Sequence, residues 1–170
     1  DKCPTDPENY NGFQDEDGCP EKNKVIIEEN SIVILEQVQF ETGSAKILPA
    51  SKTLLDEVAS TLREHPEFLA VEVAGHADER GTDANNIRLT KARAASVMQA
   101  LQQRNIATNR LVSQGYGEYC PLDKASTPDA WTKNRRVEFK IVKTRDGSTN
   151  VERGCRRAED AGITPPAIAK

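Results

Sequence analysis

The sequence lacks the features that define several common protein classes. None of its apolar runs approaches the ~20 residues that span a bilayer, and its first residues lack the basic-then-apolar pattern of a signal peptide. Positive charge is not in excess, because 27 acidic residues outweigh 23 basic ones and the net charge is −4. A broad cationic field for phosphates is therefore excluded, and we expect no nucleic acid partner.

The cysteines lack the CxxC spacing of zinc and thioredoxin-type sites. They are Cys3, Cys19, Cys120 and Cys155. An even number without that motif favours disulfides and an oxidising compartment. Four cysteines permit three pairings. In one of them Cys3 with Cys19 closes a short N-terminal loop, and Cys120 with Cys155 then attaches the C-terminal segment.

The length and composition predict one compact domain with appendages. The chain has 170 residues, of which 36% are hydrophobic and 29% are charged, as in an ordinary globular protein. Because it begins with Asp1 rather than Met, we expect it to be a piece of a longer protein.

Apolar periodicity predicts the element order βαβαββ between the polar ends of the chain. Leu69, Val71 and Val73 alternate with smaller or charged residues and predict a strand with one face buried more deeply. Thr82 or Asp83 can cap the longer helix. We expect residues 117–133 to form a loop and the tail after Lys143 to lack regular structure. The predicted strands and helices are strand 31–40, helix 49–65, strand 69–74, helix 82–105, strand 111–116 and strand 137–141.

A charged loop joins the central strand to the longer helix and is a favourable place for a ligand. Asn85, Leu89 and Arg93 are spaced by four and share one helix face, while Asp78 lies in the loop. The helix N-terminus adds a partial positive charge that favours an anionic group. A carboxylate and a guanidinium near each other suit a zwitterionic end group. The alternative is that Asp78 and Arg93 form a structural ion pair with each other.

Several motifs in residues 32–143 resemble the OmpA-like peptidoglycan-binding domain. The DERGT run from Asp78 to Thr82 is similar to the lipoprotein branch of that family, with Ala77 where a Thr is usual. The resemblance implies an α+β fold of type βαβαββ over residues 31–143, with two main helices packed on a mixed four-stranded sheet. The residues that carry it are Phe40, Gly43, Ser44, Gly75–Asp78, Asn86, Leu89, Thr90, Arg93, Ala94, Gly115–Glu118, Pro121 and Asn134–Val137.

The same resemblance implies a site for meso-diaminopimelate in the peptidoglycan stem peptide. Asp78 is expected at its amine and Arg93 at its carboxylate. Strand alternation separates Arg135 from Arg136, and we expect Arg136 to face the site. The remaining expected pocket residues are Glu41, Thr42, Asn85 and Leu89. Such a domain would anchor the outer membrane to the cell wall from the periplasmic face, through a preceding β-barrel or lipid anchor, and a homo-oligomer is left open.

Residues 1–23 contain a second candidate binding site. They have almost no large apolar residues, but Asn11, Asp15 and Asp17, followed by Gly18, offer the oxygen ligands that Ca²⁺ prefers. With Cys-Pro at both Cys3 and Cys19, the segment resembles one thrombospondin type 3 repeat, which implies calcium binding. The alternative is a solvated acidic linker held by a disulfide.

An enzyme is not expected. His76 follows a strand and is interpreted as structural, and His65 lies at a helix end, so the two do not form a metal or nucleophile site. Asp78 and Glu79 are adjacent loop residues that rarely hold the separation needed for glycan hydrolysis. A further alternative is a structural envelope module with a calcium-dependent linker and protein partners.

Overall fold

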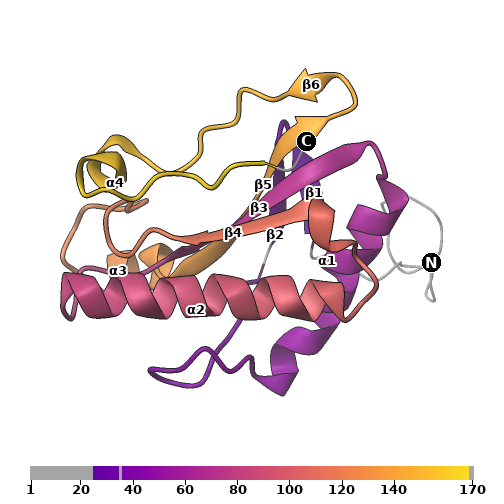
Figure 1. Cartoon of the computed structure of the whole chain (residues 1–170). Helices are drawn as coiled ribbons and strands as arrows, with labels where there is room; N and C mark the ends of the chain where they lie inside the picture. The colour runs from indigo at the N-terminus through magenta and orange to yellow at the C-terminus, as the bar shows by residue number, and fades with distance from the viewer. Residues whose placement is uncertain (1–24, 35, 169–170) are drawn as a thin grey trace, which may run out of the picture.

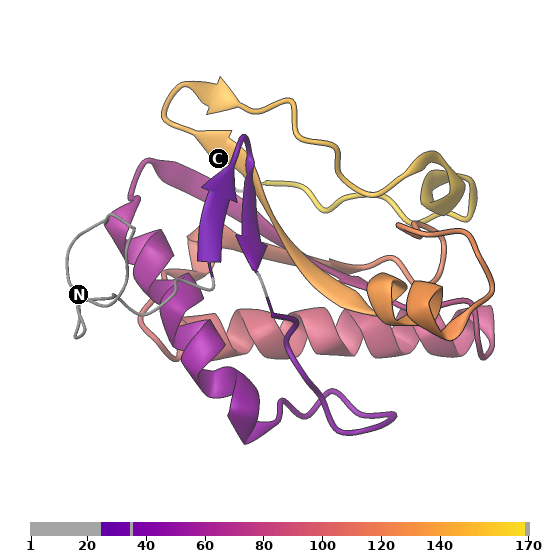
Figure 2. The same ribbon diagram turned by 180° about the vertical axis from the view of Figure 1, so that it is seen from behind.

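The computed structural model describes residues 25–34 and 36–168. A mixed six-stranded sheet has helices α1 and α2 on one face and the C-terminal segment on the other, as the two opposite views show (Figures 1 and 2). The order along the sheet is β1-β2-β5-β3-β4, with β6 paired to β5, and β3 runs parallel to β4. The strands are β1 (Val25–Glu28), β2 (Ser31–Ile34), β3 (Phe68–His76), β4 (Leu111–Gly115), β5 (Arg136–Thr144) and β6 (Gly147–Ser148).

The predicted α+β class, with two main helices on a mixed sheet, is confirmed. The predicted number of four strands was wrong, because β1 and β6 have four and two residues and are too short to give a periodic pattern. The helices are η2 (Pro49–Ser51), α1 (Lys52–Glu64), α2 (Asp83–Gln102), η3 (Thr108–Arg110), α3 (Pro128–Asn134) and α4 (Arg156–Asp160). None of the helices in the described ranges is long and apolar enough to cross a membrane.

The core lies between the sheet and helices α1 and α2. Val71 and Val73 of β3 are fully buried against this layer. The predicted difference in burial between the two faces of this strand was wrong, because Glu72 and Ala74 on the other face are buried as well. Leu69 was expected to be buried but is 37% exposed, because the register of β3 against β5 shifts between Phe68 and Val71. Such a β-bulge turns one side chain to the other face of the sheet.

The predicted strand 31–40 was too long. Strand β2 ends at Ile34; it pairs with β5 at Ser31 and Ile32 and with β1 over its whole length. Residues 36–47 then run outside the sheet, in a loop beside α2 (Figure 2). Phe40 forms an isolated bridge with Ile47 within this loop. The apolar pattern in the sequence extends beyond the end of β2 because Val38 is buried in the core although it is not part of a strand.

The polar C-terminal tail has regular structure, contrary to expectation. Strand β6 extends the sheet, and α4 packs near a second apolar cluster that contains Tyr116, Ala158 and Ile163. A disulfide between Cys120 and Cys155 attaches the tail, as one predicted pairing required. Because the tail covers the second face of the sheet, residues on both faces of β3 are buried. Cys3 and Cys19 lie outside the described residues.

The expected loop 117–133 contains helix α3. Thr127 caps it by accepting a hydrogen bond from the backbone of Ala130 at 3.2 Å, and Pro128 occupies its first position. Both are ordinary helix-start signals. The helix is only seven residues long, so its apolar periodicity was too short to be recognised.

Candidate functional site

The candidate site lies where the ends of β3 and β4 meet helix α2. A Cβ atom added to Gly75 would lie 2.5 Å from the carbonyl oxygen of Thr90, and one added to Gly115 would lie 2.1 Å from the backbone nitrogen of Lys91. Only glycine permits so close an approach of helix and strands. The helix start is fixed by Thr82, which accepts a hydrogen bond from the backbone of Asn85, so the loop 77–82 is held at both ends.

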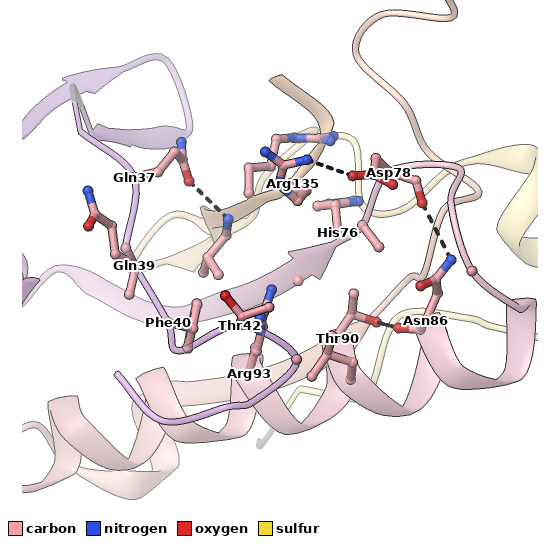
Figure 3. A pocket seen from close by; sticks show the side chains of 18 of the residues that line it. Gln37, Gln39, Phe40, Thr42, His76, Asp78, Asn86, Thr90, Arg93 and Arg135 are labelled. Carbon is pink, nitrogen blue, oxygen red and sulfur yellow. Dashed lines mark hydrogen bonds and ion pairs between the residues drawn. The ribbon is translucent and has the colours of Figure 1, made fainter. Parts of the chain in front are cut away.

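A cavity of about 770 Å³ opens beside this junction (Figure 3). Its walls come from the loop after β2, the end of β3, the exposed face of α2 and the start of β5. It includes six of the seven residues expected at the ligand site: Thr42, Asp78, Asn85, Leu89, Arg93 and Arg136. Glu41 is the exception. Its side chain forms an exposed ion pair with Lys46 at 3.5 Å, and only its backbone carbonyl contacts a site residue.

Asp78 is a buried carboxylate, 5% exposed, with two guanidinium partners. Arg80 donates to both of its oxygens, at 3.1 Å from Nε and 2.8 Å from Nη2, and Arg135 donates from Nη1 at 2.8 Å. Burial alone would raise the pKa of Asp78, but the hydrogen bonds from Arg80 and Arg135 outweigh it and lower that pKa to about 2. Asp78 is therefore ionised at neutral pH and cannot act there as an acid.

Arg93 is held separately, on the face of α2 next to the loop after β2. Its Nε donates to the carbonyl of Ser44 at 2.8 Å and its Nη2 to the carbonyl of Glu41 at 3.3 Å. The guanidinium also lies over the ring of Phe40, at 4.7 Å from the centroid. Burial, and secondarily the charge of Arg135, lower the pKa of Arg93. A direct ion pair between Asp78 and Arg93 is not formed, which contradicts the structural alternative considered for these residues.

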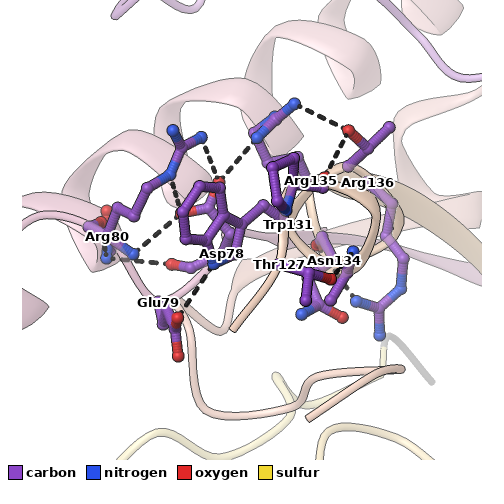
Figure 4. A network of polar contacts seen from close by, with 12 residues as sticks. Asp78, Glu79, Arg80, Thr127, Trp131, Asn134, Arg135 and Arg136 are labelled. Carbon is purple, nitrogen blue, oxygen red and sulfur yellow. Dashed lines mark hydrogen bonds and ion pairs between the residues drawn. The ribbon is translucent and has the colours of Figure 1, made fainter. Parts of the chain in front are cut away.

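Of the two neighbouring arginines after α3, Arg135 contacts Asp78. The buried Arg136 borders the cavity, but its guanidinium turns towards the far face of the sheet (Figure 4). There it donates to Glu138 at 2.6 Å and to the carbonyl of Cys120 at 2.9 Å. The preference for Arg136 rested on simple alternation, whereas Arg135 is the C-cap residue of α3 and lies outside β5.

His76 is buried beneath the site and stacks on Tyr116, with ring centroids 5.4 Å apart. Burial lowers its pKa, so the neutral imidazole is favoured. Its Nε2 lies 3.5 Å from Glu138. The interpretation of His76 as a structural residue is consistent with this environment, although it does not hydrogen-bond its own loop.

Asn86 and Thr90 hold the loop above α2. The Asn86 amide donates to the carbonyl of Arg80 at 3.0 Å and to the Glu118 side chain at 2.8 Å. Thr90 bonds back to the carbonyl of Asn86 and accepts from the backbone of Gly117. Both side chains are buried, so they position Asp78 from below without contacting its carboxylate.

The sequence did not predict that Arg80 and Trp131 form part of the site around Asp78. The Arg80 guanidinium lies over the indole ring, 4.4 Å from its centroid, and the indole N–H donates to Glu79 at 2.9 Å (Figure 4). This hydrogen bond lowers the pKa of Glu79. Because both Asp78 and Glu79 are held ionised, they do not form the acid and base pair of a glycosidase. The available signals were the position of Arg80 in the DERGT run and a single tryptophan in a polar segment.

The described residues contain no group of three His, Cys, Asp or Glu side chains that could hold a metal ion. Asn11, Asp15 and Asp17 lie outside the described residues. The expected calcium site therefore stays a prediction.

Comparison with known proteins gives the family. The chain is 38% identical to "Probable lipoprotein YiaD" of Escherichia coli over 104 residues, covering 61% of the chain and 47% of that protein. It is 31% identical to the peptidoglycan-associated lipoprotein of Brucella melitensis over 102 residues, or 60% of each protein. The chain therefore spans about half to three fifths of the length of these relatives.

A solved structure described as the cell wall anchor of the type VI secretion system of Pseudomonas aeruginosa also has this fold. It superposes with a TM-score of 0.59 at 26% identity, over 68% of the chain and 85% of that structure. The OmpA family model matches residues 39–135, which include most of the cavity lining together with Asp78 and Arg93. Its members are non-enzymatic proteins, so the expectation that the chain is no enzyme is confirmed. The chain belongs to the OmpA family.

Proposed function

We propose that the chain binds peptidoglycan non-covalently, with meso-diaminopimelate of the stem peptide in the cavity between β3 and α2. One observation carries this proposal. A carboxylate and a guanidinium border the same cavity, are held by different elements and do not neutralise each other. This arrangement suits an end group that carries an ammonium and a carboxylate at a fixed separation.

Arg93 is prepared to receive a carboxylate. Its contacts with the carbonyls of Ser44 and Glu41 use the Nε donor and one of the two Nη2 donors, so both donors of Nη1 and the second donor of Nη2 are assigned to the ligand. Phe40 restrains the plane of the guanidinium. Because the arginine is already oriented and partly dehydrated, little conformational entropy is lost on binding.

The ammonium of the ligand is assigned to Asp78, which stays ionised far below neutral pH. Thr42 lies at the Arg93 end of the cavity, while Asn85 and Leu89 lie on the helix face between the two charges. These three residues supply part of the wall between Asp78 and Arg93. A cell-wall contact of this kind would anchor an envelope protein from the periplasm, and a preceding lipid anchor or barrel would attach it to the outer membrane.

The test is isothermal titration of the 170-residue chain with a muropeptide that ends in meso-diaminopimelate. Asp78→Ala and Arg93→Ala should each weaken binding tenfold or more, because a charge-assisted hydrogen bond is worth ~1.5 to 3 kcal/mol. Circular dichroism must show that both variants stay folded. Lys46→Ala, which removes only an exposed ion pair, is the matched control.

Failure of the unmodified chain to bind the muropeptide, with or without calcium, would contradict the proposal. The cavity would then belong to a structural envelope module that binds other proteins. Release of soluble fragments from intact cell wall would instead indicate a hydrolase.

A further inference from the structure

Donors of the chain itself occupy all the acceptor positions of the Asp78 carboxylate. Its Oδ1 accepts from the backbone nitrogen of Arg80 at 2.8 Å and from Nε of Arg80, and its Oδ2 accepts from Nη2 of Arg80 and Nη1 of Arg135. An ionised carboxylate has about four lone-pair positions, and these four donors use them all. An incoming ammonium therefore has to replace one of the present donors.

Arg80 is the partner that can leave at the lowest cost. Its side chain is 53% exposed and comes from a loop, whereas Arg135 is 41% exposed and also donates to Thr132. The backbone hydrogen bond from Arg80 does not depend on where its side chain lies. The loop can thus keep its shape while the guanidinium moves away.

Trp131 gives the closed position of Arg80 a defined geometry. The indole ring lies under the guanidinium, and its N–H is tied to Glu79, the residue between Asp78 and Arg80. The two carboxylates, the guanidinium and the indole form one connected group, which we call the Arg80 latch. It comprises Asp78, Glu79, Arg80 and Trp131.

We propose that the Arg80 latch is a built-in competitor for the ligand ammonium and so sets the specificity of the site for an amine-bearing end group. The inference rests on the proposed function. An ammonium that replaces the Arg80 guanidinium leaves the charge around Asp78 unchanged, so the exchange requires no uncompensated buried charge. An end group without an amine cannot make the exchange and leaves the latch closed.

The latch can be followed directly because Trp131 is the only tryptophan of the chain. We would titrate a muropeptide whose diaminopimelate amine is either free or acetylated and record both heat and tryptophan emission. The free-amine ligand should bind and change the Trp131 emission as the guanidinium leaves the ring. The acetylated ligand should produce neither effect.

The decisive variant is Arg80→Gln, which removes the competitor and keeps a polar side chain. We expect it to bind the free-amine ligand about fivefold more tightly, because the half-exposed Arg80 guanidinium no longer has to be displaced from Asp78. Its tryptophan emission should respond much less to the ligand. Arg80→Lys keeps the charge, so its affinity should lie between those of the unmodified chain and Arg80→Gln. Arg156→Gln removes an 85% exposed guanidinium of α4 and should bind the ligand as the unmodified chain does.

Weaker or equal binding by Arg80→Gln would overturn the latch, because Arg80 would then contribute a ligand contact or nothing. Saturating binding to the unmodified chain without any change in Trp131 emission would overturn it as well. Both results differ from a failure of the proposed function, in which neither the unmodified chain nor any variant binds the free-amine muropeptide.

Discussion

Replacing Arg153 by Met would test whether the C-terminal segment is an essential part of the fold. Glu72 lies in the central strand β3 and is fully buried, beneath the tail. Arg153 reaches it from the tail, with Nε donating to its carboxylate at 3.0 Å, and the Tyr116 hydroxyl donates to the same side chain. Burial, followed by the hydrogen bond to Glu72, raises the pKa of Tyr116, so the hydroxyl stays protonated.

The expected loss in the free energy of unfolding follows from the burial of the Arg153–Glu72 ion pair. Removing one partner of a buried ion pair costs about 3 to 5 kcal/mol, because the remaining charge is left uncompensated. The Arg153 side chain is 18% exposed, which places the expected loss near the lower end, at about 3 kcal/mol. Since domains of this size are stable by only ~5 to 15 kcal/mol, the variant should still fold.

Urea unfolding followed by circular dichroism would measure the effect in a double-mutant cycle. Arg153→Met should unfold at a much lower urea concentration, and combining it with Glu72→Gln should recover most of the loss, because a neutral amide needs no counter-charge. Arg156→Met is the control, since its ion pair with Asp160 is exposed and worth little. A loss below about 1 kcal/mol for Arg153→Met, or no recovery in the double variant, would refute this account of the tail.

Two further predictions concern the site. Gly115→Ala should lower the free energy of unfolding by about 2 kcal/mol or more, because its Cβ would meet backbone atoms of α2 that cannot rotate away, and an unchanged urea midpoint would contradict the close contact. The lowered pKa of Asp78, about 2 against an ordinary 3.8, means that its contribution to stability is present above about pH 4 and is lost as the pH falls through 2. Asp78→Asn should therefore be less stable than the unmodified chain by about 2 kcal/mol at pH 7 and equally stable near pH 2, and a pH-independent difference would show that the ionised form is not favoured by its partners.

Local sequence patterns were sufficient to predict the main helices and the positions of Asp78 and Arg93. The spacing of Leu54, Val58 and Leu62 predicted α1, and a cap at Thr82 or Asp83 predicted the start of α2, where Thr82 is the N-cap, because helix periodicity and capping depend only on neighbouring residues. The same logic placed Asp78 on the loop and Arg93 on the outer face of the helix. Asp78 lies just after the end of β3, and Arg93 lies within α2, whose period gives the face on which it stands.

Local pattern failed where pairing or burial came from a distant segment. The polar tail gave no periodic signal, yet it forms a layer because Cys155 and Arg153 attach it to residues on other elements. Leu69 was wrongly expected to be buried, since a bulge depends on the partner strand as well as on its own sequence. Helix α3 was missed because seven residues are too few to show a period.

The sequence by itself determined the family, the α+β class, the main helices and two of the charged residues that border the cavity, Asp78 and Arg93. These depend on motifs and on spacings of three or four residues, which a chain carries wherever it packs. Only the tertiary structure decided which charges pair. Asp78 is bound by Arg135, which is 57 residues away, and Arg80 lies over Trp131, so the partners of the carboxylate follow from how β3 and α3 pack together. Electrostatic contacts depend on distance in space and on burial, and neither quantity is written in the order of the residues.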